Sequence, residues 1–140
     1  MNKAIDVGVK RGDAIQSRLS GYAAQLRYED LDADTIHAAK VRAIDTLGAL
    51  IGGFFGEASK SARDVAARMP QPGGATVIGT RLKTSPDVAA FVNGTTARYV
   101  EMNDVYHWPG SSGGHPSDVL MPVLGVAEHV QAGGRDFITA

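Results

Sequence analysis

Apolar residues recur every three or four positions along the first part of the chain, and this spacing predicts helices. A first helix is expected to begin at Asp13, and the apolar residues of its one face are Ile15, Leu19, Tyr22, Ala23 and Leu26. A longer helix is expected next, because Asp30, Asp32 and Asp34 can accept hydrogen bonds from the free N–H groups of a helix start. The residues expected on its buried face are Ile36, Ala39, Ala43, Leu47, Leu50 and Phe54. Gly56 is expected to end this helix.

The middle of the chain contains a third helix and a strand signal. The helix is expected at residues 60–69, closed by Pro70 and Pro72, because proline does not continue a helix. Residues 75–79 form a short apolar run between glycines, which predicts one strand in a small hairpin or at a sheet edge. The glycine pair at residues 73–74 is interpreted as a turn and not a phosphate-binding loop, since no Lys-Ser or Lys-Thr follows it.

Ser85, Pro86 and Asp87 predict the start of another helix. Serine is a good N-cap, proline fits the first helical position, and an aspartate in the first turn faces the positive end of the helix dipole. The helix is expected to run to Tyr99 or Val100. Its inward residues are expected to be Val88, Phe91, Val92 and Tyr99.

Beyond a polar loop, Ser117 is expected to cap a helix that runs through Val130 and ends at the glycine pair 133–134. Pro122 is expected in the first turn of this helix after a short lead-in, because an interior proline would lose a hydrogen bond. Residues 135–140 resemble the opening turn of one more helix, which is too short to be stable alone. The chain is therefore expected to be the front part of a longer, mainly α protein.

Composition limits the domain organisation and the chemistry. The chain has 140 residues, of which 44% are hydrophobic, so one ordinary domain is expected at residues 13–140 behind a flexible leader at residues 1–12. The formal net charge is −1 and the basic residues are scattered, which argues against nucleic acid as a partner. The absence of cysteine excludes disulfides, cysteine nucleophiles and thiolate metal sites within this chain. No signal peptide or membrane span is visible, and a cytoplasmic location without membrane contact is expected.

The most polar stretch of the chain is the loop between residues 101 and 118. Within eighteen residues it carries Glu101, Asn103, Asp104, Tyr106, His107, His115, Ser117 and Asp118. Histidine titrates near neutral pH and can move protons during a reaction, and a neighbouring carboxylate can orient the imidazole or act as the complementary acid or base. Backbone N–H groups that follow His115 at a helix start would also suit a substrate carboxylate.

Two other interpretations of this loop remain open at the level of residue types. A glycine-rich loop with two histidines can be a plain surface loop, in which Tyr106 and Trp108 anchor the loop and do not stack on a ligand. The alternative is a metal site formed by His107, His115 and Asp104, although their spacing matches no familiar metal motif. The other two histidines, which are expected to be solvated, are His37 and His129.

Two sequence blocks carry a family resemblance. Residues 90–106 read AFVNGTTARYVEMNDVY, and residues 114–124 read GHPSDVLMPVL. Together with AIDTLG at residues 43–48 and GRDF at residues 134–137, these blocks resemble the MmgE/PrpD family, in the same order from about Asp13 to the last residue. That family includes 2-methylcitrate dehydratases and cis-aconitate decarboxylases.

The resemblance implies a fold and a reaction. It implies the N-terminal portion of a large all-helical domain with one short strand or hairpin, a domain that in the family is joined to an α+β lid and usually forms a homodimer. It implies elimination of water or carbon dioxide from small tricarboxylates without a metal or another cofactor. His115 matches the active-site histidine of the family, Glu101 occupies a site position where aspartate is usual, and Val105 one where threonine is usual. The later lysines, second active-site histidine and lid of the family are absent from this chain.

Two hypotheses about function follow. In the first, the chain is part of a metal-free dehydratase that acts on a small di- or tricarboxylate and is incomplete on its own. His115, Glu101 and Asp104 would be its acid–base groups, while Asn103 and Ser117 would hold substrate oxygens. In the second, the chain is a non-catalytic truncated paralogue or split subunit, an assembly module with an exposed apolar face. The expected macromolecular partner is a second copy of the chain or a companion polypeptide encoded downstream.

Overall fold

Helices and one hairpin make up the part of the chain that the computed structural model describes, which is residues 13–107, 109–110 and 113–140. The predicted leader at residues 1–12 lies outside the described residues. The helices are α1 (Ala14–Gln25), the short 3-10 helix η1 (Tyr28–Asp30), α2 (Ala33–Gly53), α3 (Glu57–Ala66), α4 (Pro86–Arg98), α5 (Ser117–His129) and α6 (Gly134–Thr139). The strands β1 (Pro70–Thr76) and β2 (Lys83–Thr84) pair antiparallel. The prediction of a mainly α fold with one small hairpin is therefore confirmed.

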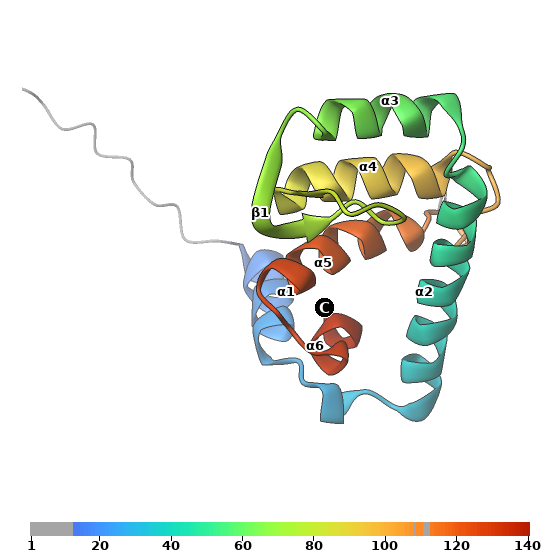
Figure 1. Ribbon diagram of the computed structural model, residues 1–140. Coiled ribbons are helices and arrows are strands. Elements are labelled where there is room, and N and C mark those ends of the chain that lie inside the picture. The colour runs from blue at the N-terminus through green and yellow to red at the C-terminus, as the bar shows by residue number, and fades with distance from the viewer. Residues whose placement is uncertain (1–12, 108, 111–112) are drawn as a thin grey trace, which may run out of the picture.

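The helix α4 lies at the centre of the arrangement, with α3 on one side and α5 on the other (Figure 1). The helix α2 runs across the ends of α4 and α5, beside the loop that joins them. One core cluster, between α3, α4 and the end of β1, consists of Ala62, Ala66, Val77 and Val92. A second cluster, where α2, α4 and α5 meet, consists of Leu50, Ala97 and Met121. Neither cluster contains an aromatic side chain, so the helices approach one another through small and aliphatic residues.

Aspartates begin the first two α-helices, as the sequence predicts. The Asp13 carboxylate accepts a hydrogen bond from the Gln16 N–H at 2.7 Å, and the Asp32 carboxylate accepts one from the Thr35 N–H at 2.7 Å. The hydrogen bonds from the backbone and the side chain of Thr35 lower the pKa of Asp32. Pro86 lies in the first turn of α4 after an extended Ser85, which confirms that helix start.

The third helix and the strand both begin earlier than predicted. The helix α3 covers Glu57–Ala66 and not residues 60–69. Gly56 ends the turn that follows α2 and is also the N-cap of α3, so α3 begins directly after that turn. The strand β1 covers Pro70–Thr76 and not residues 75–79, so two prolines expected to close a helix belong to a strand. Proline lacks a backbone N–H and is tolerated here, because a two-stranded sheet has only edge strands and the pairing contains a bulge.

The inward face predicted for α4 is wrong in part, and the apolar face of α1 does not meet the core. The helix α1 contains no buried residue among those described, and its apolar face is exposed. On α4, Phe91 is 57% exposed and Tyr99, which follows the helix, is also exposed. The residues that α4 does bury are Ala89, Val92, Asn93, Thr96 and Ala97. Periodicity shows which residues share a face, but the fit of small side chains against α2 and α5 decides which face meets the core.

The helix α2 has a buried face that differs by about one position from the predicted one. Its buried residues are Thr46, Ala49, Leu50 and Gly53. Of the predicted face, Leu50 is buried, Leu47 is exposed, and the residues that are half-buried are Ile36, Ala39, Ala43 and Phe54. Although α2 has 21 residues, none of the helices in the described part is both long and apolar enough to cross a membrane.

The helix α5 contains Pro122 in its interior, which corrects the prediction that this proline lies in the first turn. Pro116 takes the N-cap position, so Ser117 is the first helical residue and not the cap. Pro122 cannot donate a hydrogen bond to the Asp118 carbonyl, and the helix still continues to residue 129 because its other turns remain bonded. The predicted helical turn at the end of the chain is confirmed as α6.

Polar side chains connect the hairpin to α4 and α5. The Asn93 amide of α4 accepts the Ile78 N–H and donates to the Thr76 carbonyl, each at 3.0 Å. The Glu128 carboxylate of α5 accepts the Thr76 N–H at 2.6 Å and the Lys83 ammonium at 3.0 Å. These bonds fix α5 against the hairpin and so fix the position of the loop that precedes α5.

Candidate functional site

The polar loop lies between the end of α4 and the start of α5, and a pair of backbone hydrogen bonds closes its neck. The Tyr106 N–H donates to the Gly114 carbonyl at 2.8 Å, and the Gly114 N–H donates to the Tyr106 carbonyl at 3.0 Å. Gly113 has a φ of +77°, and a Cβ atom there would lie 2.8 Å from the Tyr106 carbonyl oxygen. The neck therefore requires glycine at position 113. His115 is the residue that directly follows the hydrogen-bonded pair of Tyr106 and Gly114.

His115 is half-buried and held by the backbone of the same loop. Its Nδ1 atom lies 2.6 Å from the Asp104 carbonyl oxygen. A carbonyl oxygen can only accept a hydrogen bond, so Nδ1 is the protonated nitrogen of the ring. In the neutral ring, Nε2 is then the nitrogen whose lone pair can accept a proton. This arrangement gives His115 the form required of a general base.

The Asp104 carboxylate is fully buried, and its side chain has an exposed fraction of 0%. Its Oδ1 atom accepts the Ser117 N–H, the first amide of α5, at 3.2 Å. Its Oδ2 atom lies 3.7 Å from Nε of Arg42 on α2 and has no hydrogen bond among the described residues. Asp104 thus brings together the loop, the start of α5 and the middle of α2.

The two predicted substrate-binding residues lie beside Asp104. The Asn103 amide donates to the Ala97 carbonyl at 3.0 Å, which leaves its Oδ1 atom buried and unpaired in the described structure. The Ser117 hydroxyl is buried and also lacks a described partner. Other buried polar atoms without a described partner lie elsewhere, for example at Thr46 and Ser59, but those of Asn103, Asp104 and Ser117 lie together beside His115.

The structure places Glu101 apart from this cluster. Its side chain is exposed and forms no hydrogen bond or ion pair within the described residues, so no contact joins it to His115 or Asp104. Its backbone has a φ of +53°, in the left-handed region that residues other than glycine rarely adopt. Such conformations are often found at functional sites, where the surrounding structure compensates for their cost.

Among the described residues, no hydrogen bond joins His107, His129 or Tyr106 to the side chain of His115 or Asp104. His107 and Tyr106 are exposed at the loop, and Trp108 lies outside the described residues. In the part of the chain that is described, no group of three His, Asp or Glu side chains is placed to hold a metal ion, so the alternative ligand set of His107, His115 and Asp104 is not assembled. His129 is exposed and contacts the Gly73 carbonyl at 3.2 Å.

Arg42 is the site residue that the sequence analysis missed. It lies four positions before Thr46 and eleven before Gly53, so it is in register with the buried face of α2, although its own side chain is 48% exposed. A charged residue in register with a buried helical face was the available signal, because such a charge requires a partner. A second arginine, Arg98 at the end of α4, lies 3.5 Å from the Asp118 carboxylate at the start of α5.

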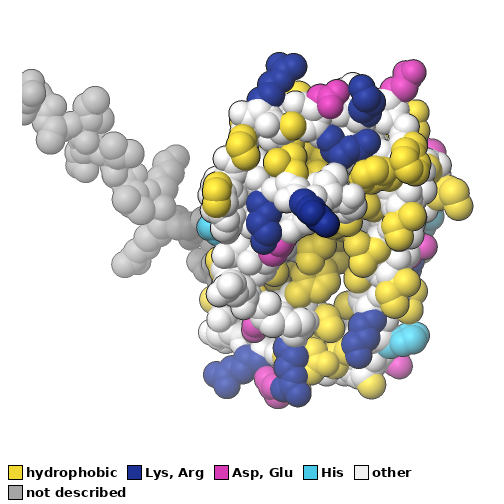
Figure 2. Space-filling view, in the orientation of Figure 1, with side chains coloured by type: hydrophobic (Ala, Val, Ile, Leu, Met, Phe, Trp, Pro, Cys, Tyr) yellow, Lys and Arg dark blue, Asp and Glu magenta, His cyan; other side chains and the backbone are white. Residues whose placement is uncertain are grey.

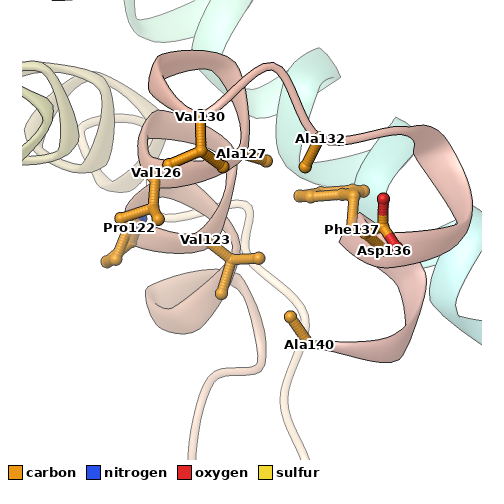
Figure 3. A pocket seen from close by; sticks show the side chains of 9 residues that line it. All are labelled: Pro122, Val123, Val126, Ala127, Val130, Ala132, Asp136, Phe137 and Ala140. Atoms are coloured by element: carbon orange, nitrogen blue, oxygen red, sulfur yellow. The ribbon is translucent and has the colours of Figure 1, made fainter. Parts of the chain in front are cut away.

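An apolar groove lies between α5 and α6, away from His115. It occupies about 340 Å³, and in Figure 3 the side chains of both helices point into it. Asp136 is the only titratable residue in its lining. A neighbouring pocket of about 190 Å³ shares Phe137 with this groove and reaches Arg42 and Pro116, the residue after His115. The smaller pocket is therefore the one that borders the polar cluster.

Comparisons with known proteins show what this chain is similar to. The family model described as MmgE/PrpD N-terminal domain matches residues 17–140. A 2-methylcitrate dehydratase from Cupriavidus necator is 33% identical over 115 residues, which cover 78% of this chain and 23% of that protein. A probable 2-methylcitrate dehydratase from Saccharomyces cerevisiae is 31% identical over 96 residues, covering 68% of this chain and 18% of that protein.

A cis-aconitate decarboxylase-like protein from Aspergillus oryzae is 29% identical over 122 residues, which cover 86% of this chain and 24% of that protein. The chain thus spans about a fifth of the length of these curated relatives. No solved structure matches it.

Proposed function

Since this chain belongs to the MmgE/PrpD family, we propose that it contributes His115 and the residues around it to a cytoplasmic active site. That site removes water from a small di- or tricarboxylate. The observation that carries this proposal is the hydrogen bond from His115 Nδ1 to the Asp104 carbonyl, which leaves Nε2 able to accept a proton. The names of the relatives from Cupriavidus necator and Saccharomyces cerevisiae support dehydration as the reaction.

The proposed reaction is a pair of proton transfers. His115 Nε2 takes the proton from the carbon next to a substrate carboxylate, and the electrons of that C–H bond form a carbon–carbon double bond. The C–O bond of the neighbouring hydroxyl breaks, and the oxygen leaves as water after it receives a proton, which we assign to Glu101. Glu101 is exposed and unpaired within the described residues, so a substrate can reach it. Neither transfer requires a metal or another cofactor.

Substrate recognition is assigned to the buried polar atoms beside His115. The unpaired Oδ1 of Asn103 can accept a hydrogen bond from a substrate hydroxyl, and the Ser117 hydroxyl can donate to a substrate oxygen. Glu101 and Val105 replace the aspartate and threonine that are usual in the family, so both residues influence which carboxylate substrate the site binds. A carboxylate displaced by one methylene changes a rate by on the order of 100-fold.

Turnover of 2-methylcitrate and of cis-aconitate tests the proposal. The chain is assayed alone and mixed with the polypeptide encoded downstream of it, with His115→Asn as the test variant and His107→Asn as the matched control from the same loop. We expect His115→Asn to lower kcat by about 10²–10⁴-fold and His107→Asn to leave it within about twofold. A folded wild-type chain with no turnover in either setting, or equal activity of both variants, contradicts the proposal.

A second candidate function, assembly with another polypeptide, is favoured by an apolar stripe on α2. The stripe consists of Val41, Ile44, Gly48, Ile51 and Phe55, spaced at three or four positions and opposite the buried face of the helix. Ile44 and Ile51 are each 72% exposed, and Phe55, just beyond the helix, is 91% exposed. Figure 1 shows α2 at the edge of the molecule, with the other helices on one side of it.

Exposed apolar side chains are not confined to α2. Figure 2 shows hydrophobic side chains in the hollow between α2 and α5 as well as along the α2 edge. Contiguous exposed apolar surface of this kind typically marks a binding surface. The stripe supports a second copy of the chain or a companion polypeptide as its partner.

Light scattering tests assembly. We expect the wild-type chain to be larger than a monomer, or to bind the downstream polypeptide. The paired substitution Ile44→Lys and Ile51→Lys is expected to abolish that association, while Val65→Lys on the exposed part of α3 does not. A compact wild-type monomer that binds no companion rules this second function out.

A further inference from the structure

We propose that Asp104 is a positioning residue and not an acid–base group, because it holds His115 in the tautomer with the proton on Nδ1. The carboxylate anchors Asp104 to α5 and α2, and the anchored main-chain carbonyl then fixes the imidazole. The catalytic importance of this arrangement rests on the proposed role of His115, whereas the arrangement itself can be measured in the absence of turnover.

Asp104 holds the start of α5 at two points. The carbonyl oxygen of Asp104 accepts from His115 Nδ1 at 2.6 Å, and its carboxylate accepts from the Ser117 N–H at 3.2 Å. His115 and Ser117 are two positions apart in the chain. The two bonds therefore fix the ring of His115 relative to the first turn of the helix, which a single bond could not do.

Asp104 and His115 differ in how far their side chains are buried. The Asp104 side chain has no exposed surface, while His115 is half-buried. An acid–base group must contact the reacting atoms, directly or through a water molecule. The Asp104 carboxylate faces the Ser117 amide and Arg42, so its described contacts are all internal. A buried carboxylate with internal partners fits the task of orientation, as in sites where a second group fixes the tautomer of a histidine.

Arg42 is the counter-ion of the Asp104 carboxylate. A buried carboxylate is unfavourable without a nearby positive charge, and Arg42 Nε lies 3.7 Å from Asp104 Oδ2. This separation exceeds a hydrogen bond, so Arg42 neutralises the carboxylate without fixing its geometry. The Ser117 amide fixes the geometry. The two contacts of the carboxylate therefore have separable effects, and substitutions can distinguish them.

Nuclear magnetic resonance of the chain labelled with ¹⁵N-histidine tests the proposal, because it reports which ring nitrogen carries the proton. Spectra are recorded at about two pH units above the usual titration of histidine, where the ring is neutral. The test variants are Asp104→Ala, Asp104→Asn and Arg42→Gln. Asp45→Asn is the matched control, because Asp45 is an exposed aspartate of α2 without a described contact.

We expect the wild-type ring of His115 to be protonated on Nδ1. Asp104→Ala should shift the ratio of the two tautomers by about fivefold towards Nε2, which corresponds to the loss of one hydrogen bond. Asp104→Asn retains an oxygen for the Ser117 N–H and should preserve the wild-type tautomer, as should Asp45→Asn. Arg42→Gln should preserve the tautomer and lower only the midpoint of thermal unfolding.

Either of two results overturns the proposal: a wild-type ring protonated on Nε2, or an unchanged tautomer in a folded Asp104→Ala variant. If Asp104→Ala does not fold, loss of the wild-type tautomer in Asp104→Asn, which keeps the anchoring oxygen, overturns it as well. Failure of the proposed dehydratase activity leaves these spectra unaffected, so the two ideas fail independently.

Discussion

Gly53 of α2 and Thr96 of α4 are in contact at their backbones: a Cβ atom at Gly53 would lie 2.0 Å from the Thr96 carbonyl oxygen. We predict that Gly53→Ala destabilises the chain by about 3 kcal/mol or more, because the obstacle is backbone and cannot rotate away. Urea unfolding measures the change. The predicted result depends on α2 crossing α4 closely, the same crossing that brings Arg42 towards Asp104.

Gly48→Ala is the matched control on the same helix, because nothing lies within 4 Å of a Cβ atom there. The substitution is predicted to stabilise the chain by about 0.5–1 kcal/mol, since alanine favours the helix more than glycine. Similar changes in the free energy of unfolding at both positions would show that α2 and α4 do not approach as described.

Glu128→Gln is predicted to remove a pH-dependent contribution to stability. Burial raises the pKa of Glu128, but hydrogen bonds from Thr76 and Lys83 outweigh burial and lower the pKa below its usual value. The ionised form therefore stabilises the folded state above the unfolded-state pKa, and this stabilisation is lost as the pH falls through the lower, folded-state pKa. The carboxylate and ammonium are partly exposed, so the expected loss near neutral pH is about 0.5–1 kcal/mol.

Urea unfolding at several pH values measures this effect. The difference between wild type and Glu128→Gln should diminish in acid, where both side chains are uncharged. Asp45→Asn, at an exposed carboxylate, should show little difference at any pH. A Glu128→Gln difference that stays constant down to acid pH would contradict the assigned cause.

Glu101→Gly is predicted to separate stability from activity. Glu101 has a φ of +53°, and glycine adopts this backbone conformation without the steric cost of a side chain. Glycine also increases the freedom of the unfolded chain, so the net gain should be modest, about 0.5–1 kcal/mol. At the same time the variant lacks the carboxylate that we assign to the leaving oxygen, and turnover should fall.

Gln131 provides the control, because it is the other described residue besides glycine with a positive φ, at +56°. Gln131→Gly should give a similar gain in thermal stability with unchanged turnover. If Glu101→Gly retains full turnover in the same assay, the acid role of Glu101 is wrong.

Val105→Thr tests the basis of substrate choice. Val105 is exposed, so a threonine can replace it with a change in stability within about 0.5 kcal/mol. The new hydroxyl should change the ratio of kcat/KM values for 2-methylcitrate and cis-aconitate. An identical ratio in wild type and Val105→Thr would show that this position does not contact the substrate.

Helix starts were predictable because their signals are local. Asp13 and Asp32 cap helices through hydrogen bonds that span three residues, and Pro86 fits a first turn whatever lies around it. The outward position of Phe91 was not predictable in this way, because it depends on how α2 and α5 approach α4. Pro122 was also misplaced, since the cost of an interior proline depends on the packing of the whole helix.

The candidate site was predictable where its residues are close in sequence. His115, Asp104 and Ser117 belong to one loop, and a short loop brings its polar residues together. Arg42 comes from a helix far earlier in the chain, and it lies near the Asp104 carboxylate only because α2 packs across α4 and α5. Which oxygen of Asp104 meets His115 was also beyond the sequence, because residue types do not distinguish a carbonyl from a carboxylate.

The paired backbone bonds between Tyr106 and Gly114 make the outer part of the loop tolerant of insertion. Extra residues between Pro109 and Gly110 would lengthen a loop whose two ends are already joined by the hydrogen bonds between Tyr106 and Gly114. Each doubling of the length of a loop costs only about 0.6 kcal/mol in closure entropy. His115 follows the joined ends and would keep its place. Insertions at this point would therefore change the outer part of the loop and leave His115, Asp104 and Ser117 where they are.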